Sequence, residues 1–322
     1  MGSTSTGVCI FLLNQTGVCV PTRPDTKRLT TDDLLAALNT QLSHGVKIFR
    51  GERHQVNFFT AADQIDTSEQ RSVSVVEHGS DIFSLWITSP LLELQLMRKQ
   101  RPFNILANWS RLLEKYTTAN REAIDNDEPV LSYQRNVFCS KETESECDDP
   151  NILELLYEEA KLNILDGRYP CDEYEHFAAT QAFIEHGPYE PKLHTPEYFK
   201  LHDYEYLPLH YRTRSSDRTS SQSSRSSQWF SPSRRGQRSL YSKIVEHYKA
   251  IVHQTPRLQL IKWYVDKCRE MDFYGAAYFT GQIERVTRGV GLLVNHYDKK
   301  VWVAINHYGV HVINQKNSVS LE

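Results

Sequence analysis

Residues 83–96 read FSLWITSPLLELQL, and this stretch decides the first part of the fold. The aromatic and aliphatic run from Phe83 to Ile87 predicts a strand, and Leu91–Leu96 predicts a second strand. The side chains of Trp86, Leu92 and Leu94 are expected to face inward or to lie at a contact between lobes.

Upstream of these strands, the sequence predicts a hairpin and then a helix. An apolar run from Val8 to Leu13 and a second run at 18–20, stopped by Pro21, flank a turn. Thr30, with Asp33 three residues later, resembles a capping box at the start of a helix. The apolar stripe of that helix is Leu34, Leu35, Leu38 and Leu42. This order of elements is typical of a ubiquitin-like sheet that carries one helix, with a long insertion at about 45–76.

The middle of the chain is predicted to be helical from about 125 to 270. Asp149 is an N-cap candidate, Pro150 fits the first helical position, and Gly167 closes the far end. Its expected stripe is Ile152, Leu155, Leu156, Ala160 and Ile164. Two further helices are expected, with stripes Ile244, Val245, Tyr248 and Ile251, then Leu258, Ile261, Val265 and Cys268.

An arginine-serine segment interrupts this helical part. Residues 212–238 carry seven arginines and one aspartate but almost no aliphatic side chain. Such a segment cannot bury enough apolar surface to offset the entropy of ordering it, so we expect a disordered loop.

After Met271 the pattern changes to alternating, β-branched residues. Strands are expected at Ala277–Ile283, Val301–Ile305 and Val310–Ile313, with a tight turn at Gly309. Three or four strands amount to about half of a sandwich or barrel domain.

The composition is that of a globular chain with several domains. Of 322 residues, 39% are hydrophobic and 24% are charged, and the net charge of −3 does not favour nucleic acid. Six cysteines without a C-x-x-C pair favour a reducing compartment, and Cys9 and Cys19 are interpreted as free thiols rather than a disulfide. The longest early apolar run, VCIFLL, is too short to span a membrane and lacks the basic segment of a signal peptide, so a cytosolic protein is expected.

Four segments in this order resemble the FERM domain family. They are FSLWITSPLLELQL from Phe83, LLYEEAKLNILDGRYPC from Leu155, FYGAAYFTGQI from Phe273 and VWVAINHYGVHVI from Val301. The resemblance implies an α+β fold of three lobes: ubiquitin-like (7–120), helical and acyl-CoA-binding-protein-like (125–270), and PH/PTB-like (271–322). The later strands and closing helix of the family's third lobe are missing here, so 271–322 is expected to form a partial lobe.

The sequence offers no catalytic constellation. It contains no phosphatase loop, kinase signature, P-loop or G-x-S-x-G motif, so we predict no enzyme activity and no cofactor. His307 and His311 flank the expected turn at Gly309 and lack further metal ligands. The pair Glu158-Glu159 is expected at a solvated helix edge, and His176 and His186 are expected to be ordinary surface or packing residues.

Three features of the sequence suggest how the protein is regulated. Gly2 in MGSTST fits an N-myristoylation pattern, with a tolerated polar tail as the alternative. Ser215 and Ser221 resemble basophilic kinase sites and Ser231 a proline-directed one. The segment 212–238 is either a phosphorylation-controlled contact with anionic membrane or a spacer.

The resemblance implies a non-catalytic adaptor that is cytoplasmic and peripheral at the plasma membrane or other membranes. The partner it implies is the cytosolic tail of an inactive rhomboid protein, with stabilisation of a cell-surface sheddase complex. A Wnt co-receptor tail is an alternative partner. From a different class, an arginine-serine RNA-associated protein is the other alternative.

Overall fold

The computed structural model describes residues 6–13, 16–22, 25–43, 48–50, 79–212, 240–283, 299–315 and 319–321. The chain divides into two compact units. The first unit comprises Met1–Glu159 and Gly275–His311, and the second comprises Ala160–Tyr274 and Val312–Glu322. Gly2 and most of the predicted insertions 45–76 and 212–238 lie outside the described residues.

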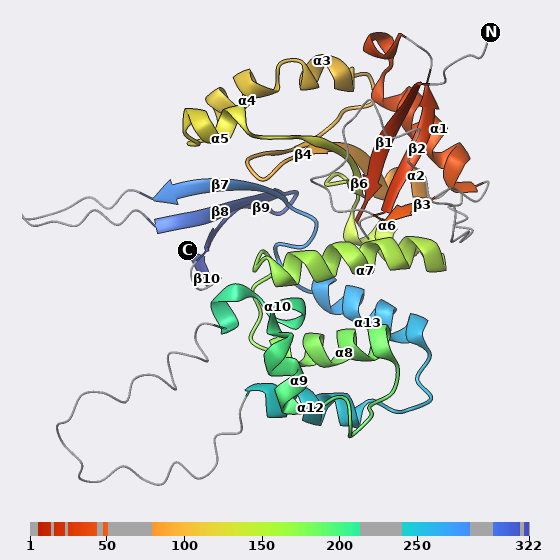
Figure 1. Ribbon diagram of the computed structural model, residues 1–322, viewed down its shortest axis with the longest axis vertical. Helices are drawn as coiled ribbons and strands as arrows, with labels where there is room; N and C mark the ends of the chain where they lie inside the picture. Colours follow the sequence, from red (N-terminus) through yellow and green to blue (C-terminus); the bar gives the residue numbers. More distant parts are fainter. Residues whose placement is uncertain are drawn as a thin grey trace, which may run out of the picture. The chain divides into compact units, whose positions relative to one another are not determined.

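Within the described part of the first unit, six strands form a mixed sheet in the order β3-β2-β1-β6-β4-β5 (Figure 1). The strands are β1 (Thr6–Leu12), β2 (Thr16–Thr22), β3 (Ile48–Arg50), β4 (Phe83–Thr88), β5 (Glu93–Gln95) and β6 (Val130–Arg135). β1 pairs antiparallel with β2 and parallel with β6, while β4 pairs antiparallel with β6 and β5. The predicted hairpin and the strand at Phe83 are confirmed. Cys9 lies opposite Cys19 across the hairpin, and both are free thiols.

Strand β5 is shorter than the predicted Leu91–Leu96. The Ser89 hydroxyl accepts the backbone N–H groups of Leu91 and Leu92 at 3.1 and 3.2 Å, so both residues belong to the turn. Trp86 and Leu92 are buried as expected, whereas Leu94 is only half-buried.

Two other strands were not predicted. β6 lies inside the range 125–270 that the sequence assigned to helices, and it occupies the interior of the sheet. β3 lies inside the range 45–76 that was treated as an insertion, and it pairs with β2 at the sheet edge.

Helix α1 (Thr31–Ser43) begins as its sequence predicts. The Thr30 backbone N–H donates to Asp33 Oδ2 at 2.8 Å, and the Asp33 N–H donates to Thr30 Oγ1 at 3.3 Å. This reciprocal pair satisfies two backbone donors at the helix start. The stripe Leu34, Leu38 and Leu42 is buried, and Leu35 is half-buried.

Short helices follow the sheet strands of the first unit. They are η1 (Thr26–Arg28), α2 (Gly79–Ile82), α3 (Pro102–Leu106), α4 (Trp109–Tyr116), α5 (Arg121–Asp125) and α6 (Lys141–Ser145). Helix α7 (Pro150–Leu165) is longer. Asp149 Oδ1 caps its start by accepting the backbone N–H groups of Asn151 and Ile152. Gly167, which follows the end of the helix, has a positive φ of 72°. Its predicted apolar stripe is buried.

The second unit is mainly helical. Its helices are α8 (Tyr174–His186), α9 (Pro196–Leu201), α10 (Asp203–Tyr206), α12 (Leu240–Ala250) and α13 (Arg257–Arg269). Helix α8 contacts α10, α12 and α13 (Figure 1). Buried Tyr248 of α12 donates its hydroxyl to the carbonyls of Ala182 and Gly187 at 3.3 and 2.7 Å, which fixes α12 to the end of α8. Leu258 was predicted in the stripe of α13 but is 39% exposed.

The later strands form a separate sheet in the order β10-β9-β8-β7. They are β7 (Ala277–Ile283), β8 (Lys299–Asn306), β9 (Gly309–Asn314) and β10 (Val319–Leu321). Gly309 has a φ of 146°, which fits the expected turn before β9. The predicted strands are therefore present, and β10 is the fourth strand of this sheet.

Candidate functional site

The predicted modification sites fall outside the part that the structure describes. This applies to Gly2, Ser215, Ser221 and Ser231. Arg212 is described, and its Nη1 lies 3.3 Å from Asp203 Oδ1, while the Tyr241 hydroxyl donates to Asp203 Oδ2 at 3.1 Å. One carboxylate therefore holds the two flanks of residues 213–239 next to each other.

The histidines His307 and His311 lie on either side of Gly309. The ring of His307 lies against Tyr308, with centroids 3.8 Å apart, and His311 lies within β9. Across the described ranges, no three His, Cys, Asp or Glu side chains are arranged to hold a metal ion.

A buried charged cluster, which was not predicted from the sequence, lies at the end of β6. The Arg135 side chain is 3% exposed and its Nε pairs with the fully buried carboxylate of Glu144 in α6. The same guanidinium donates to the carbonyls of Cys139 at 2.8 Å and Gly275 at 3.4 Å. Since a buried charge is tolerated only when paired and hydrogen-bonded, this cluster joins β6, α6 and the start of the 275–283 segment.

Glycine is required at position 275 of this cluster. Its φ is +67°, a left-handed conformation that other L-residues rarely adopt. A Cβ at this position would also collide with the Arg135 guanidinium.

Glu159 of α7 is the second acid at this cluster, which contradicts its expected place at a solvated edge. The residue is half-buried, and its Oε2 accepts the backbone N–H of Arg135 at 2.8 Å. Desolvation by burial raises the pKa of Glu159 to about 7; the contacts with Arg135 oppose this rise and the nearby charge of Glu144 adds to it.

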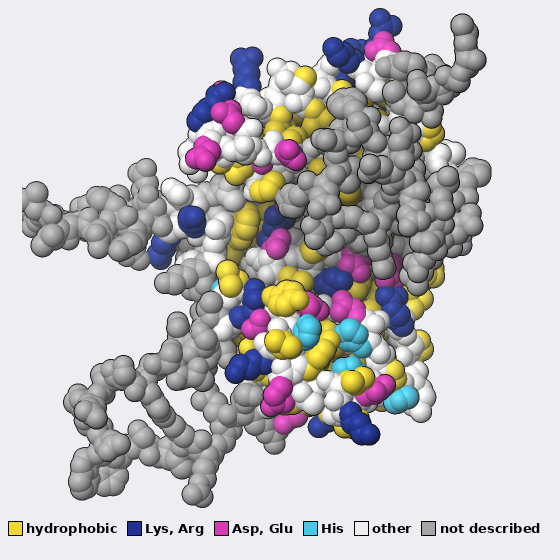
Figure 2. All heavy atoms as spheres, in the orientation of Figure 1, with side chains coloured by type: hydrophobic (Ala, Val, Ile, Leu, Met, Phe, Trp, Pro, Cys, Tyr) yellow, Lys and Arg dark blue, Asp and Glu magenta, His cyan; other side chains and the backbone are white. Residues whose placement is uncertain are grey.

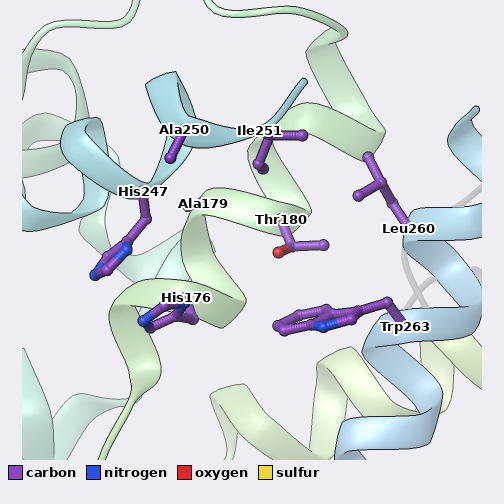
Figure 3. A pocket seen from close by; sticks show the side chains of 8 residues that line it. All are labelled: His176, Ala179, Thr180, His247, Ala250, Ile251, Leu260 and Trp263. Carbon is purple, nitrogen blue, oxygen red and sulfur yellow. The ribbon is translucent and has the colours of Figure 1, made fainter. Parts of the chain in front are cut away.

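A pocket of about 240 Å³ opens in the helical unit between α8, α12 and α13. We call it the α8–α12–α13 pocket; it is lined by His176, Ala179, Thr180, His247, Ala250, Ile251, Leu260 and Trp263. Figure 3 shows the two imidazole rings at one side, the Trp263 indole and Leu260 at the other, and Thr180 between them. The walls are therefore mainly apolar, with the two imidazoles at one side and the Thr180 hydroxyl between the sides.

The rings of the two histidines at the pocket lie against each other. His176 of α8 and His247 of α12 have ring centroids 3.6 Å apart, with planes tilted by 34°. Burial, and next the neighbouring His176, hold the pKa of His247 below its usual 6.5, so the His247 imidazole is mainly neutral at neutral pH.

His186 behaves as the packing residue that was expected. Its Nε2 lies 2.7 Å from the Tyr206 hydroxyl and 3.3 Å from that of Tyr198. Figure 2 shows histidines gathered over the helices of this unit with hydrophobic side chains beside them. In contrast, no hydrogen bond among the described residues involves an imidazole nitrogen of His176 or His247.

The sequence and the fold of the chain are similar to those of known FERM domains. The family model of the FERM central domain matches residues 142–279. The fold is similar to the MyTH4-FERM MF2 domain of Dictyostelium discoideum myosin VII, with a TM-score of 0.59 and 12% identity over 99% of this chain and 50% of that one. It is also similar to the FERM domain of Drosophila Merlin, with a TM-score of 0.52 and 13% identity over 99% of this chain and 80% of that one. Residues 142–279 therefore match the FERM central domain, and the α+β fold of the chain is FERM-like.

The chain is also similar to FERM domain-containing protein 8. It is 32% identical to the Xenopus laevis protein over 264 residues, which are 79% of this chain and 56% of that protein. It is 31% identical to the human protein over 271 residues, 80% of this chain and 55% of that protein. The chain thus spans about half the length of the curated relatives it matches.

No described helix has both the length and the apolar character needed to cross a membrane. The lobe boundaries 7–120, 125–270 and 271–322 stay a prediction, although β6 shows that sheet structure extends into the middle range.

Proposed function

We propose that the chain is a non-catalytic FERM adaptor that binds the cytosolic tail of an inactive rhomboid protein and stabilises a cell-surface sheddase complex. The observation that carries the proposal is the 32% identity to FERM domain-containing protein 8 over 264 residues. The adaptor acts in the cytoplasm, peripherally at the membrane that holds its partner.

Protein binding is a recorded property of solved FERM domains. Human myosin 7b is described with its MyTH4-FERM domain in complex with the PDZ3 domain of harmonin-a, and its fold matches this chain with a TM-score of 0.57, 15% identity, and coverage of 99% of this chain and 51% of that one. Drosophila Merlin is described as a complex of its FERM and C-terminal domains.

Exposed apolar side chains on the β8–β9 hairpin support a tail-binding surface. Ile305, Tyr308 and Val310 are 42%, 53% and 66% exposed, and Lys141 Nζ lies 4.9 Å from the centre of the Tyr308 ring. Exposed apolar groups with a cation beside them suit a segment that carries apolar and acidic residues. We call these three residues the β8–β9 surface.

Co-precipitation with the cytosolic tail of an inactive rhomboid protein tests the proposal. The intact chain should retain the tail, and Val310→Glu should reduce retention at least fivefold because it places a charge in the β8–β9 surface. Leu201→Glu is the matched control, since Leu201 is 74% exposed on α9 of the second unit. Equal retention by both variants would place the binding surface elsewhere; no retention by the intact chain would reject the proposal.

The membrane contact of residues 212–238 belongs to the same proposal. Seven arginines and one aspartate give this segment a formal charge of +6, and each basic residue near an anionic surface contributes about 1 kcal/mol before screening. Phosphorylation at Ser215, Ser221 and Ser231 adds about −1.5 to −2 charges per site and releases the contact, while a lipid at Gly2 reinforces it. Sedimentation with anionic liposomes tests this: glutamates at the three serines should weaken binding, and unchanged binding would identify a spacer.

A further inference from the structure

The α8–α12–α13 pocket has the size of one aromatic side chain. A cavity of about 150 Å³ accepts benzene, and pockets for drug-sized ligands begin near 300 Å³. The 240 Å³ of this pocket lies between these limits, so it suits a single substituted ring.

The lining of the pocket selects the kind of ring. Ile251, Leu260 and Trp263 provide apolar and aromatic contact, with Trp263 itself half-buried and available for stacking. At the other side, the His176–His247 pair presents imidazole nitrogens for which the described residues provide no hydrogen-bond partner. A neutral imidazole has one nitrogen that accepts a hydrogen bond, and a phenol hydroxyl donates one.

We propose that the α8–α12–α13 pocket binds the side chain of a tyrosine from a protein partner, with the phenol ring against Trp263 and its hydroxyl donating to the His176–His247 pair. The proposal rests on the proposed adaptor function only in that the partner supplies the tyrosine.

Binding at this pocket weakens as the pH falls. A protonated imidazole has no acceptor nitrogen, and a charge on one ring opposes a charge on the other at 3.6 Å. The remaining charged groups that face His247 are Glu173, Glu175 and Glu246, and Glu175 is paired with Lys243 at 3.1 Å. The three acids favour protonation of His247, whereas burial and the neighbouring His176 ring oppose it.

The direct test uses p-cresol, which is the tyrosine side chain, and toluene, which lacks the hydroxyl. Both are titrated into the ¹⁵N-labelled chain while the Trp263 indole N–H signal is followed. At about pH 7.5, p-cresol should bind several-fold more tightly than toluene, the ratio expected for one hydrogen bond. At about pH 5 this preference should be reduced, because protonation of His247 begins only below its usual pKa of 6.5. N-acetyl-tyrosinamide should bind as p-cresol does if the pocket admits a tyrosine within a chain.

Variants separate the pocket from the rest of the surface. Ala250→Leu fills the pocket from its exposed rim and should abolish the response, while Gln259→Leu puts the same side chain at an exposed α13 position outside the pocket and should not. A double variant with His176→Phe and His247→Phe keeps both rings but removes both acceptors, so its p-cresol affinity should fall to that of toluene.

Three results would overturn the proposal. They are equal affinity for p-cresol and toluene at both pH values, equal responses in the two leucine variants, or binding of p-cresol without binding of N-acetyl-tyrosinamide. The last result would identify a site for small phenols. None of these outcomes depends on the rhomboid tail, so failure here is distinct from failure of the adaptor function.

Discussion

Replacing Glu159 by glutamine should stabilise the protein at alkaline pH and leave its stability unchanged at acidic pH. The pKa of this carboxyl is raised from 4.5 to about 7 by burial beside Arg135 and Glu144. Between these two pH values the folded chain keeps the proton that the unfolded chain has lost. The contribution of Glu159 to the free energy of unfolding therefore falls as the pH rises through this range, and it is constant above about 7.

The size of the effect follows from the two pKa values. A separation of about 2.5 pKa units, at 1.36 kcal/mol each, sets an upper bound of about 3.4 kcal/mol for the cost of the ionised carboxylate. Because Glu159 is half-buried and its contact with the Arg135 N–H favours ionisation, we expect about 1 to 3 kcal/mol at pH 8. The glutamine oxygen can still accept that N–H.

Urea denaturation of wild type and Glu159→Gln at about pH 4.5 and 8 measures the difference. Glu158→Gln makes the same chemical change one residue earlier in α7 and controls for helix charge and propensity. A Glu159→Gln protein that is less stable than wild type at pH 8 would show that the carboxylate stabilises the cluster as an ion-pair partner, and the desolvation argument would be refuted.

Two other substitutions test the same unit. Arg135→Met should cost about 3 to 5 kcal/mol because it removes the guanidinium that pairs with the buried Glu144 carboxylate, and adding Glu144→Met should recover most of the loss; a double variant no more stable than the single one would contradict this reasoning. Trp86→Ala should cost about 3 to 5 kcal/mol, since the indole is 4% exposed and donates to the Arg135 carbonyl at 3.2 Å. An unchanged melting temperature would be incompatible with its place in the sheet.

Capping residues and apolar periodicity in the sequence predicted most of the helices and strands. Thr30 and Asp33 lie three residues apart and make the predicted capping contacts, and Asp149 caps α7 as predicted. These interactions involve neighbours along the chain, so their spacing is visible in the sequence alone. β6 was missed because its pairing with β1 is parallel and joins residues more than a hundred positions apart.

Like the pairing of β6 with β1, the charged cluster and the pocket are formed by contacts between residues far apart in the sequence. Arg135 and Glu144 look like ordinary surface charges in the sequence, and Glu158-Glu159 gives no hint that one of the two acids is buried against β6. The His176–His247 pair joins α8 to α12 across the segment 212–238. In the sequence, both histidines lie next to buried positions of amphipathic helices. This pattern alone does not predict that the two rings meet, because it does not show which helices face each other.

The proposed adaptor function requires that the chain binds the cytosolic tail of an inactive rhomboid protein. Isothermal titration of the purified chain with that tail measures it directly, with a scrambled tail of the same composition as the control. Saturable binding with one tail per chain, lost with the scrambled sequence, is the predicted result. Equal heats for the native and scrambled tails, or no saturable binding, would contradict the claim.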